Sequence, residues 1–289
     1  LPCVVIMGII VSQLHYTDVS EQTFYLQKLF GVIGIAMIVQ VLWGHRLPLI
    51  IGPASVLLIG ILSTVSSGIS AVYTGIMVGG LILTILAYSG LLGRLQFVFT
   101  PRIVTVILIL IAFTLTSVIL KLVLGDAVRA LFNMFFTLVM VLALVIGNKL
   151  LRGIWKSTTV LWGIVGGVLV YYGVFGLPML PSTGVEIILE QATVLNFPLN
   201  FEAGTILAFL FCYIALIVNE LGSIQAVGHM LQADHMDRRT TRGVGIVGVV
   251  NMLSGLFGVI GPVDYSMSPG VISATGCASR YTLLPAGVG

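Results

Sequence analysis

The segment Ile260–Val271, "IGPVDYSMSPGV", interrupts a region whose flanking residues are apolar enough to cross a membrane. It contains two prolines, which interrupt a regular helix, and two serines, an aspartate and a tyrosine, which place polar groups at membrane depth. A backbone group left unpaired in hydrocarbon costs several kcal/mol, so irregular chain at that depth must be buried in protein or line a polar cavity. The segment therefore predicts a broken membrane span with a protected polar site.

The composition of the whole chain is that of an integral membrane protein. Of its 289 residues, 58% are hydrophobic and 8% charged, against about 25% charged residues in soluble domains. Apolar runs of about 20 residues, enough to cross a bilayer core of roughly 30 Å, recur without a separate soluble domain. We expect an all-α polytopic fold in the lipid bilayer with ten spans, the first incomplete, near residues 1–14, 24–43, 47–65, 71–92, 103–123, 130–148, 159–176, 205–228, 244–258 and 260–280.

The charged residues predict the orientation. With the N-terminus inside, one side of the membrane receives ten of the thirteen Lys and Arg residues. These are Arg46, Arg94, Arg102, Lys149, Arg152, Lys156, Arg238, Arg239, Arg242 and Arg280. The other side receives mainly Asp18, Glu21, Asp126, Glu186, Glu190 and Glu202. This asymmetry follows the positive-inside rule and predicts a multi-pass protein of the cell inner (plasma) membrane with a cytoplasmic N-terminus.

Several features exclude other classes. The net charge of +3 is small and does not indicate a nucleic-acid partner. Cys3, Cys212 and Cys277 lack the spacing of a metal site or a disulfide framework, so we expect packing roles and neither a metal nor a cofactor. Both ends of the chain lie inside apolar stretches, so we expect a fragment of a longer protein. Residues 1–14 do not have the pattern of a secretory signal peptide.

A second broken span mirrors the first. Arg46–Gly60, "RLPLIIGPASVLLIG", is the third span, and the opening segment is third after the long exterior connection 177–204. Broken spans at matching places in two halves point to an inverted-repeat transporter with its site near the bilayer midplane. This predicts a first repeat at 1–176 and the start of a second at 205–289, each repeat having seven spans.

Glycines and prolines mark the two breaks. Pro53 follows Gly52, and Pro262 follows Gly261, so we expect the chain to switch from extended to helical at each place. Amides exposed at such a helix start can receive an electronegative ligand atom. Pro262 and Pro269 are expected to bracket the second break, and Gly270 to allow close packing of the helix that follows.

The eighth span contains polar residues deep in an apolar run, "LIVNELGSIQAVGHM". Asn219 and Ser223 are four residues apart and share a helix face. Glu220 points roughly 100° away from Asn219. An ionisable residue in a membrane span is a functional candidate by default, so Glu220 is the main candidate for proton coupling. Asp264 is a weaker one, since it could lie near the outer water boundary.

Two further motifs favour structural interpretations. Val250–Gly261 is rich in small residues typical of close helix packing. His229–Arg242 contains scattered metal-ligand types but is better explained as a basic cytoplasmic loop. Catalytic motifs for a hydrolase, prenyltransferase or ATPase are absent from the sequence, so no catalytic residue is assigned.

Taken in order, "HRLPLIIGPASVLL", "NELGSIQA" and "NMLSGLFGVIGPVDYSMSPGVISATG" resemble the nucleobase-ascorbate transporter family, which includes uracil and xanthine permeases. The most specific positions are Asn251, Ser254–Gly258, Tyr265, Gly270 and Thr275–Gly276. The resemblance implies fourteen spans in two inverted repeats, about ten of them present here, with short strands in the third and tenth. It also implies a core domain from spans 1–4 and 8–10 and a gate domain from spans 5–7.

The resemblance also implies the substrate-binding positions. These would be Ala54, Ser55, Asn219, Ser223, Ser266, Met267 and Ser268. Three of them depart from the family pattern: relatives usually have Glu at the position of Asn219, Glu or Gln at that of Met267, and Asn at that of Ser268. An amide at Asn219 can bind a nucleobase edge but cannot hold a proton, which leaves Glu220 as the candidate for coupling.

The resulting hypothesis is a secondary active transporter of a small nucleobase-like substrate of the uracil or xanthine type, working by alternating access. The coupling ion would be a proton, with sodium as an alternative, and the protein could form a homodimer. One open alternative is a divergent member that carries another organic solute or anion without proton coupling. Another is a membrane-embedded enzyme or a structural protein.

Overall fold

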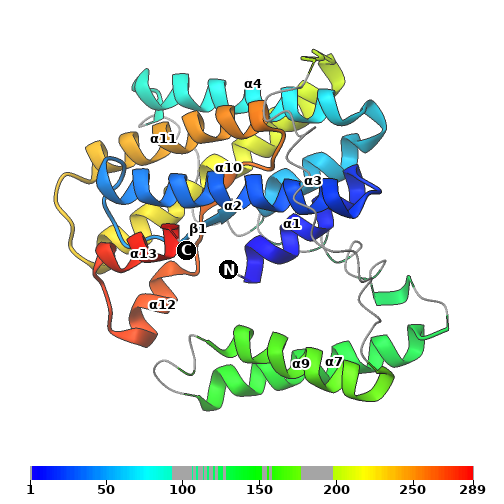
Figure 1. Cartoon of the computed structure of the whole chain (residues 1–289). Helices are drawn as coiled ribbons and strands as arrows, with labels where there is room; N and C mark the ends of the chain where they lie inside the picture. The colour runs from blue at the N-terminus through cyan, green and yellow to red at the C-terminus, as the bar shows by residue number, and fades with distance from the viewer. Residues whose placement is uncertain are drawn as a thin grey trace.

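Helices follow the apolar runs in the computed structural model, which describes residues 2–92, 128–151, 158–176 and 198–288 and a few positions at 106–125 and 155. The helices are α1 (Pro2–His15), α2 (Val19–Leu42), α3 (Ser55–Thr64), α4 (Ile69–Tyr88), α7 (Ala130–Leu150), α9 (Thr159–Phe175), α10 (Ala203–Met230), α11 (Met236–Phe257), α12 (Ser268–Thr275) and α13 (Leu283–Val288) (Figure 1). Short 3-10 turns occur at Val65–Ser67 and Arg280–Thr282. Most of the predicted fifth span, 103–123, and most of the connection 177–204 lie outside the described residues.

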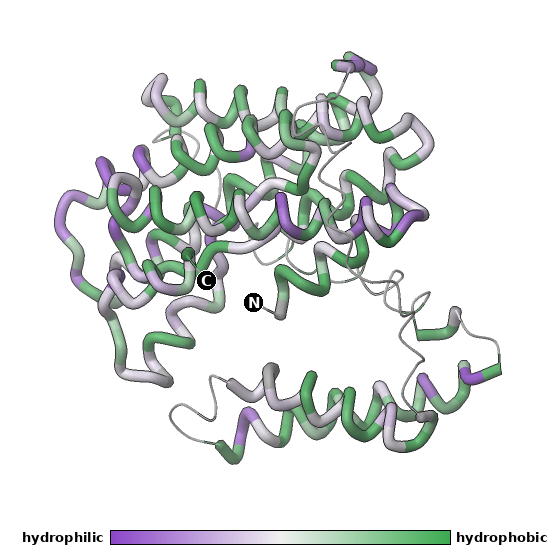
Figure 2. The backbone as a smooth tube through the Cα atoms, viewed as in Figure 1, coloured by the Kyte–Doolittle hydropathy of each residue, from purple (hydrophilic) through white to green (hydrophobic). Residues whose placement is uncertain are grey.

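The long helices have the character of membrane spans. Five of the described helices, α2, α4, α7, α10 and α11, are long and apolar enough to cross a bilayer. Most of the residues in these helices are hydrophobic, and hydrophilic residues gather mainly at the helix ends and connections (Figure 2). The predicted helical membrane protein is therefore confirmed, while the total number of spans stays a prediction.

The start of α11 corrects the sequence analysis. We expected the ninth span to begin at residue 244 after a basic loop, but α11 begins at Met236. Only residues 231–235 connect it to α10, which ends at Met230. Hydropathy finds the segment that fits the hydrocarbon and cannot detect helical turns that continue into the polar boundary. Arg239 is consequently held on a helix rather than on a loop.

Small residues allow α4 and α11 to pack closely. A Cβ atom on Gly80 of α4 would overlap the backbone of Met252, and one on Gly255 of α11 would overlap the backbone of Tyr73 and Met77. This contact confirms the expected packing role of the small residues in Val250–Gly261. The pair packs beside α10, whose Phe209 is fully buried.

Helices α7 and α9 form a separate hairpin, drawn in green in Figure 1. The hydroxyl of Tyr171 donates to Oδ1 of Asn133 at 3.1 Å. The rings of Phe132 and Phe175 meet edge to face with centroids 4.7 Å apart. None of the residues of α7 is fully buried.

Each broken span contains a short strand, as the family resemblance implied. Strand β1 (Ile51–Pro53) pairs with β2 (Pro262–Asp264) in antiparallel register, Gly52 facing Val263. Helix α3 begins directly after β1, at Ser55. Pro262 does not start a helix as expected; it starts β2, and α12 begins only at Ser268, with Pro269 in its first turn. The restricted φ of proline suits both an edge strand and a first helical turn.

Candidate functional site

One edge of β2 is occupied by β1. The amide of Ala54 donates to the carbonyl of Gly261 at 2.9 Å, and that of Tyr265 donates to the carbonyl of Ile50 at 2.8 Å. In an antiparallel strand, alternate residues direct their N–H and C=O groups to opposite edges. The backbone groups of Pro262 and Asp264 therefore point away from β1 and need other partners.

Helix α10 supplies partners for Asp264. The amide of Asn219 and the hydroxyl of Ser223 both donate to the carbonyl of Asp264, each at 3.1 Å. The amide N–H of Asp264 donates to Oε2 of Glu220 at 2.9 Å. Three polar side chains of one span thus hold a single strand residue. Glu220 lies roughly 100° around α10 from Asn219, and both still reach β2, because the N–H and C=O of Asp264 leave the strand on the same edge.

Helix α11 supplies the partner for Pro262. The amide of Asn251 donates to the carbonyl of Pro262 at 2.8 Å, and Asn251 is fully buried. Its Oδ1 lies 3.0 Å from the hydroxyl of Tyr213, which also lies 2.9 Å from the carbonyl of Ile76. Side chains from two helices therefore satisfy the free edge of β2. This explains how an extended segment is tolerated inside a membrane protein.

Two glycines are required where side chains approach the strands. A Cβ atom on Gly52 would overlap the ring of Tyr265, whose hydroxyl donates to the carbonyl of Pro53 at 3.3 Å. A Cβ atom on Gly261 would overlap the amide of Asn251.

A cluster of three ionisable side chains lies beside the strands. Glu220, Asp264 and His45 are all 0% exposed, and Nε2 of His45 lies 3.1 Å from Oδ2 of Asp264. The carboxyl groups of Glu220 and Asp264 are close enough to share a hydrogen bond if one is protonated. Without such a proton, four atoms of the cluster have no hydrogen-bond partner: Oε1 of Glu220, both Oδ atoms of Asp264 and Nε2 of His45. We name these three residues the carboxyl–histidine cluster.

The predicted substrate-binding residues divide into two groups. Ser55 and Asn219 are partly exposed, and Ser266 and Met267 are exposed, Met267 by 50% of its surface. The buried group consists of Ala54, Ser223 and Ser268.

The buried group has structural bonds that the sequence analysis did not foresee. The Ala54 amide, expected to face a solute, is already bonded to Gly261. The hydroxyl of Ser268, also expected to face a solute, donates to the carbonyl of Tyr265 at 2.7 Å and accepts the amide N–H of Ile50 at 3.0 Å. Gly270 does not provide close packing as predicted, since a Cβ atom there would meet open space.

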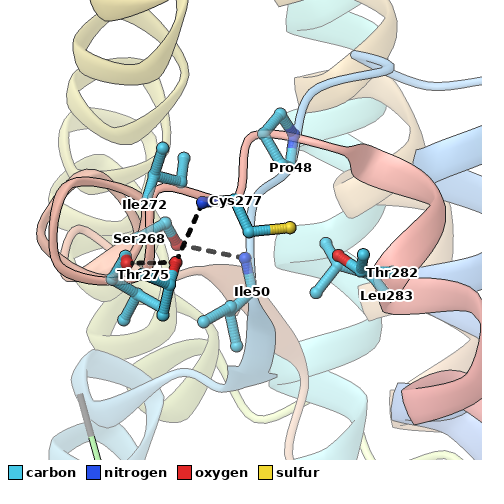
Figure 3. Close-up of a pocket in the computed structure, with 9 residues that line it drawn as sticks. Pro48, Ile50, Ser268, Ile272, Thr275, Cys277, Thr282 and Leu283 are labelled. Carbon is cyan, nitrogen blue, oxygen red and sulfur yellow. Dashed lines mark hydrogen bonds between the residues drawn. The ribbon is translucent and has the colours of Figure 1, made fainter. Parts of the chain in front are cut away.

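A pocket of about 190 Å³ lies between residues 48–50, α12 and the segment that leads to α13 (Figure 3). Its wall is mainly aliphatic, and the serine and threonine hydroxyls that line it are bonded within the protein. The hydroxyl of Thr275 donates to the carbonyl of Val271 at 2.8 Å and accepts the amide N–H of Cys277 at 3.3 Å. The pocket shares only Ser268 with the predicted binding residues, so it does not define the substrate site.

His45 is the residue of the cluster that the sequence analysis missed. It precedes the third span, and its role depends on a contact with Asp264, more than 200 positions along the chain. The sequence contained one signal that could have identified it: an ionisable residue lies at each of the two breaks, His45 at the first and Asp264 at the second. Asp264, expected near the outer boundary, is instead fully buried.

The fold and the site together define the class of the protein. A helical membrane protein in which two strand–helix units meet antiparallel beside buried ionisable groups has the features of a secondary transporter.

The comparisons identify the family. A protein-family model described as "Permease family" matches residues 2–289. The chain belongs to this family, the nucleobase-ascorbate transporters. It is 27% identical to "Putative purine permease YwdJ" of Bacillus subtilis (strain 168) over 296 residues, which cover 96% of this chain and 67% of the relative.

Two more relatives have similar coverage. The chain is 23% identical to the uric acid permease PucJ of Bacillus subtilis (strain 168), over 93% of this chain and 63% of the relative. It is 21% identical to the xanthine permease of the same organism, over 98% of this chain and 66% of the relative. The chain thus spans about two thirds of the length of these relatives.

Proposed function

We propose that this protein is a proton-coupled secondary transporter of a nucleobase-like solute, of the xanthine or uracil type. The observation that carries the proposal is the free edge of β2. The side chains that hold this edge include a buried carboxyl group, Glu220, and a partly exposed amide, Asn219. A group able to hold a proton is therefore one residue away from a group able to bind a nucleobase edge. The printed names of the relatives, which include purine, uric acid and xanthine permeases, support this solute class.

The solute would bind where α3 and α12 begin. Helix α3 starts directly after β1, and α12 starts at Ser268, shortly after β2. Helix N-termini carry partial positive charge that favours carbonyl oxygens. Ser55, Asn219, Ser266 and Met267 are the predicted binding residues that remain accessible there. Asn219 would bind the ring edge, and Met267 would contact the ring face as an apolar wall. Ala54, Ser223 and Ser268 would act by holding the strands.

The coupling proton would reside on the carboxyl–histidine cluster. Two adjacent ionised carboxylates in an apolar interior are strongly unfavourable, and one shared proton gives the unpartnered oxygens a donor. Alternating access would expose the cluster to each side of the membrane in turn. Sodium coupling and a homodimer stay predictions.

The architecture expected for the whole protein supports alternating access. The strand–helix units β1–α3 and β2–α12 meet antiparallel, as units from two inverted repeats would. Helix α13 packs on α2 where Gly287 meets Gly34, and α11 packs on α4 where Gly255 meets the backbone of Tyr73. The proposal includes fourteen spans, a core domain containing the strands, and a gate domain containing α7 and α9.

The orientation is proposed from the arginines. Arg239 and Arg280 both donate to the carbonyl of Arg46, at 3.2 and 3.4 Å, so three of the residues assigned to the cytoplasmic side lie together. A cytoplasmic N-terminus in the cell inner membrane agrees with this arrangement.

The function is tested by uptake of radiolabelled xanthine, uric acid, guanine and uracil into proteoliposomes, with and without an inward proton gradient. We expect accumulation of at least one of them only with the gradient. Uptake that equilibrates without accumulation would instead support a divergent member without proton coupling. Lack of both binding and uptake for every purine and pyrimidine would refute the nucleobase assignment.

Replacing Met267 by alanine tests the location of the solute. If Met267 contacts the ring, Met267→Ala should weaken binding by about 1 kcal/mol, or about fivefold in Kd. Isothermal titration of the purified protein with the best solute from the uptake panel measures the change. Met230→Ala is the matched control, since Met230 is 44% exposed at the far end of α10. Equal affinity of the two variants would place the solute elsewhere.

A further inference from the structure

We propose that Glu220 is the member of the carboxyl–histidine cluster that carries the proton, and that His45 is a positioning residue that keeps Asp264 ionised. This inference rests on the proposed proton coupling and specifies where the proton resides.

The backbone around His45 fixes the position of its ring. The amide N–H of His45 lies 3.3 Å from Oε1 of Gln40, and its carbonyl accepts from the guanidinium of Arg239 at 2.9 Å. Gln40 is itself held, since its amide donates to the carbonyl of Gly243 at 2.8 Å. A Cβ atom on Gly243 would press against the His45 side chain. The ring therefore has little freedom to turn away from the strands.

The hydrogen bonds of His45 also determine its tautomer. The amide N–H of Leu47 donates to Nδ1 of His45 at 2.9 Å, so Nδ1 must present a lone pair. In a neutral imidazole the hydrogen is then on Nε2. This N–H lies 3.1 Å from Oδ2 of Asp264, at ion-pair distance although not in full hydrogen-bond alignment. A second proton on Nδ1 would break the bond to Leu47, so His45 acts as a fixed donor.

The two carboxyl groups have different surroundings. Asp264 faces the N–H of His45, which stabilises a negative charge. Glu220 accepts the backbone N–H of Asp264 with Oε2, and its Oε1 has no partner. A proton on Oε1 of Glu220 can be donated to the carboxylate of Asp264. Placing the proton on Oε1 of Glu220 gives both Glu220 and Asp264 a hydrogen-bond partner and leaves the bonds of His45 unchanged.

Among the described residues, one further charged group interacts with the cluster. The ionisable groups that interact with it from the described elements are Glu220 on α10, Asp264 on β2, His45 before β1 and Arg239 on α11. Arg239 is bonded to the carbonyls of His45 and Arg46 and to that of Asp234. Its role here is to hold the turn that carries His45.

Infrared difference spectroscopy of the purified protein in lipid nanodiscs tests the assignment. We expect the carbonyl stretch of a protonated carboxylic acid at neutral pH, with its characteristic shift in D2O. It should be lost in Glu220→Gln and retained in Asp264→Asn, both of which preserve side-chain shape. Glu202→Gln, at the exposed N-terminus of the same helix, should leave it unchanged. Absence of the band from the unsubstituted protein, or loss in Asp264→Asn, would overturn the assignment.

The role of His45 is tested in the Glu220→Gln background. Adding His45→Leu removes the donor facing Asp264, so Asp264 should become protonated and the band should reappear. Adding His45→Gln retains an N–H donor, and the band should stay absent. No band with His45→Leu would refute the positioning role. These spectra do not depend on transport, so failure here is distinguishable from failure of the uptake experiment.

Discussion

Glu220→Gln is expected to abolish accumulation of solute against its gradient while leaving exchange across the membrane intact. A pH difference of one unit that drives one proton per solute sustains about tenfold accumulation, equivalent to about 1.4 kcal/mol. Glutamine retains an oxygen that can accept the amide N–H of Asp264, now 2.9 Å from Oε2, but it cannot bind and release a proton at this site. Accumulation should therefore fall from about tenfold to the equilibrium ratio.

The measurement compares proton-driven uptake with counterflow exchange in the same proteoliposomes. Glu202→Gln provides the matched control: Glu202 is exposed at the start of α10, and its substitution should change neither assay. Full accumulation by Glu220→Gln would show that the coupling proton does not depend on this residue. Loss of exchange as well would indicate that Glu220 is needed for the structural cycle rather than for coupling alone.

Asn251→Leu is expected to destabilise the fold more than any other single polar substitution near the strands. It removes the donor to the carbonyl of Pro262 and the acceptor that faces Tyr213. The hydroxyl of Tyr213 keeps the carbonyl of Ile76 as a partner, whereas Asn251 is the one side chain of the described residues that donates to the carbonyl of Pro262. An orphaned buried polar group costs about 1–3 kcal/mol.

The loss should lower the melting temperature by about 2–12 °C, since about 1–3 kcal/mol is removed and each kcal/mol corresponds to about 2–4 °C. Fluorescence-detected size exclusion after heating measures this in detergent. The control is Asn148→Leu, because Asn148 is exposed near the end of α7. An unchanged melting temperature for Asn251→Leu would mean that the free edge of β2 is satisfied in another way.

Several elements could be predicted from sequence because they depend on local composition. Apolar runs must become helices in hydrocarbon, where every backbone group needs an internal partner, and α2, α4, α7 and α10 lie where those runs predicted. The prolines and glycines at the two breaks identified the spans that could not be continuous helices. The family resemblance then supplied the short strands.

The roles of individual polar residues were harder to predict. Ser268 and Ala54 were expected to face a solute because their residue types and positions allow it, but their groups are bonded within the protein. Gly270 was assigned to packing, and the space beside it is open. The residue type determines which hydrogen bonds a side chain can make. Its neighbours in the folded structure determine which of these are left to bind a solute.

The sequence by itself determined that this is a helical membrane protein with two broken spans and an ionisable residue in the eighth. Only the tertiary structure decided that Glu220, Asp264 and His45 form one cluster. These three residues come from separate elements, and no local pattern records their distance. The antiparallel register of β1 and β2 brings them together, because it directs both backbone groups of Asp264 toward α10 and its side chain toward His45.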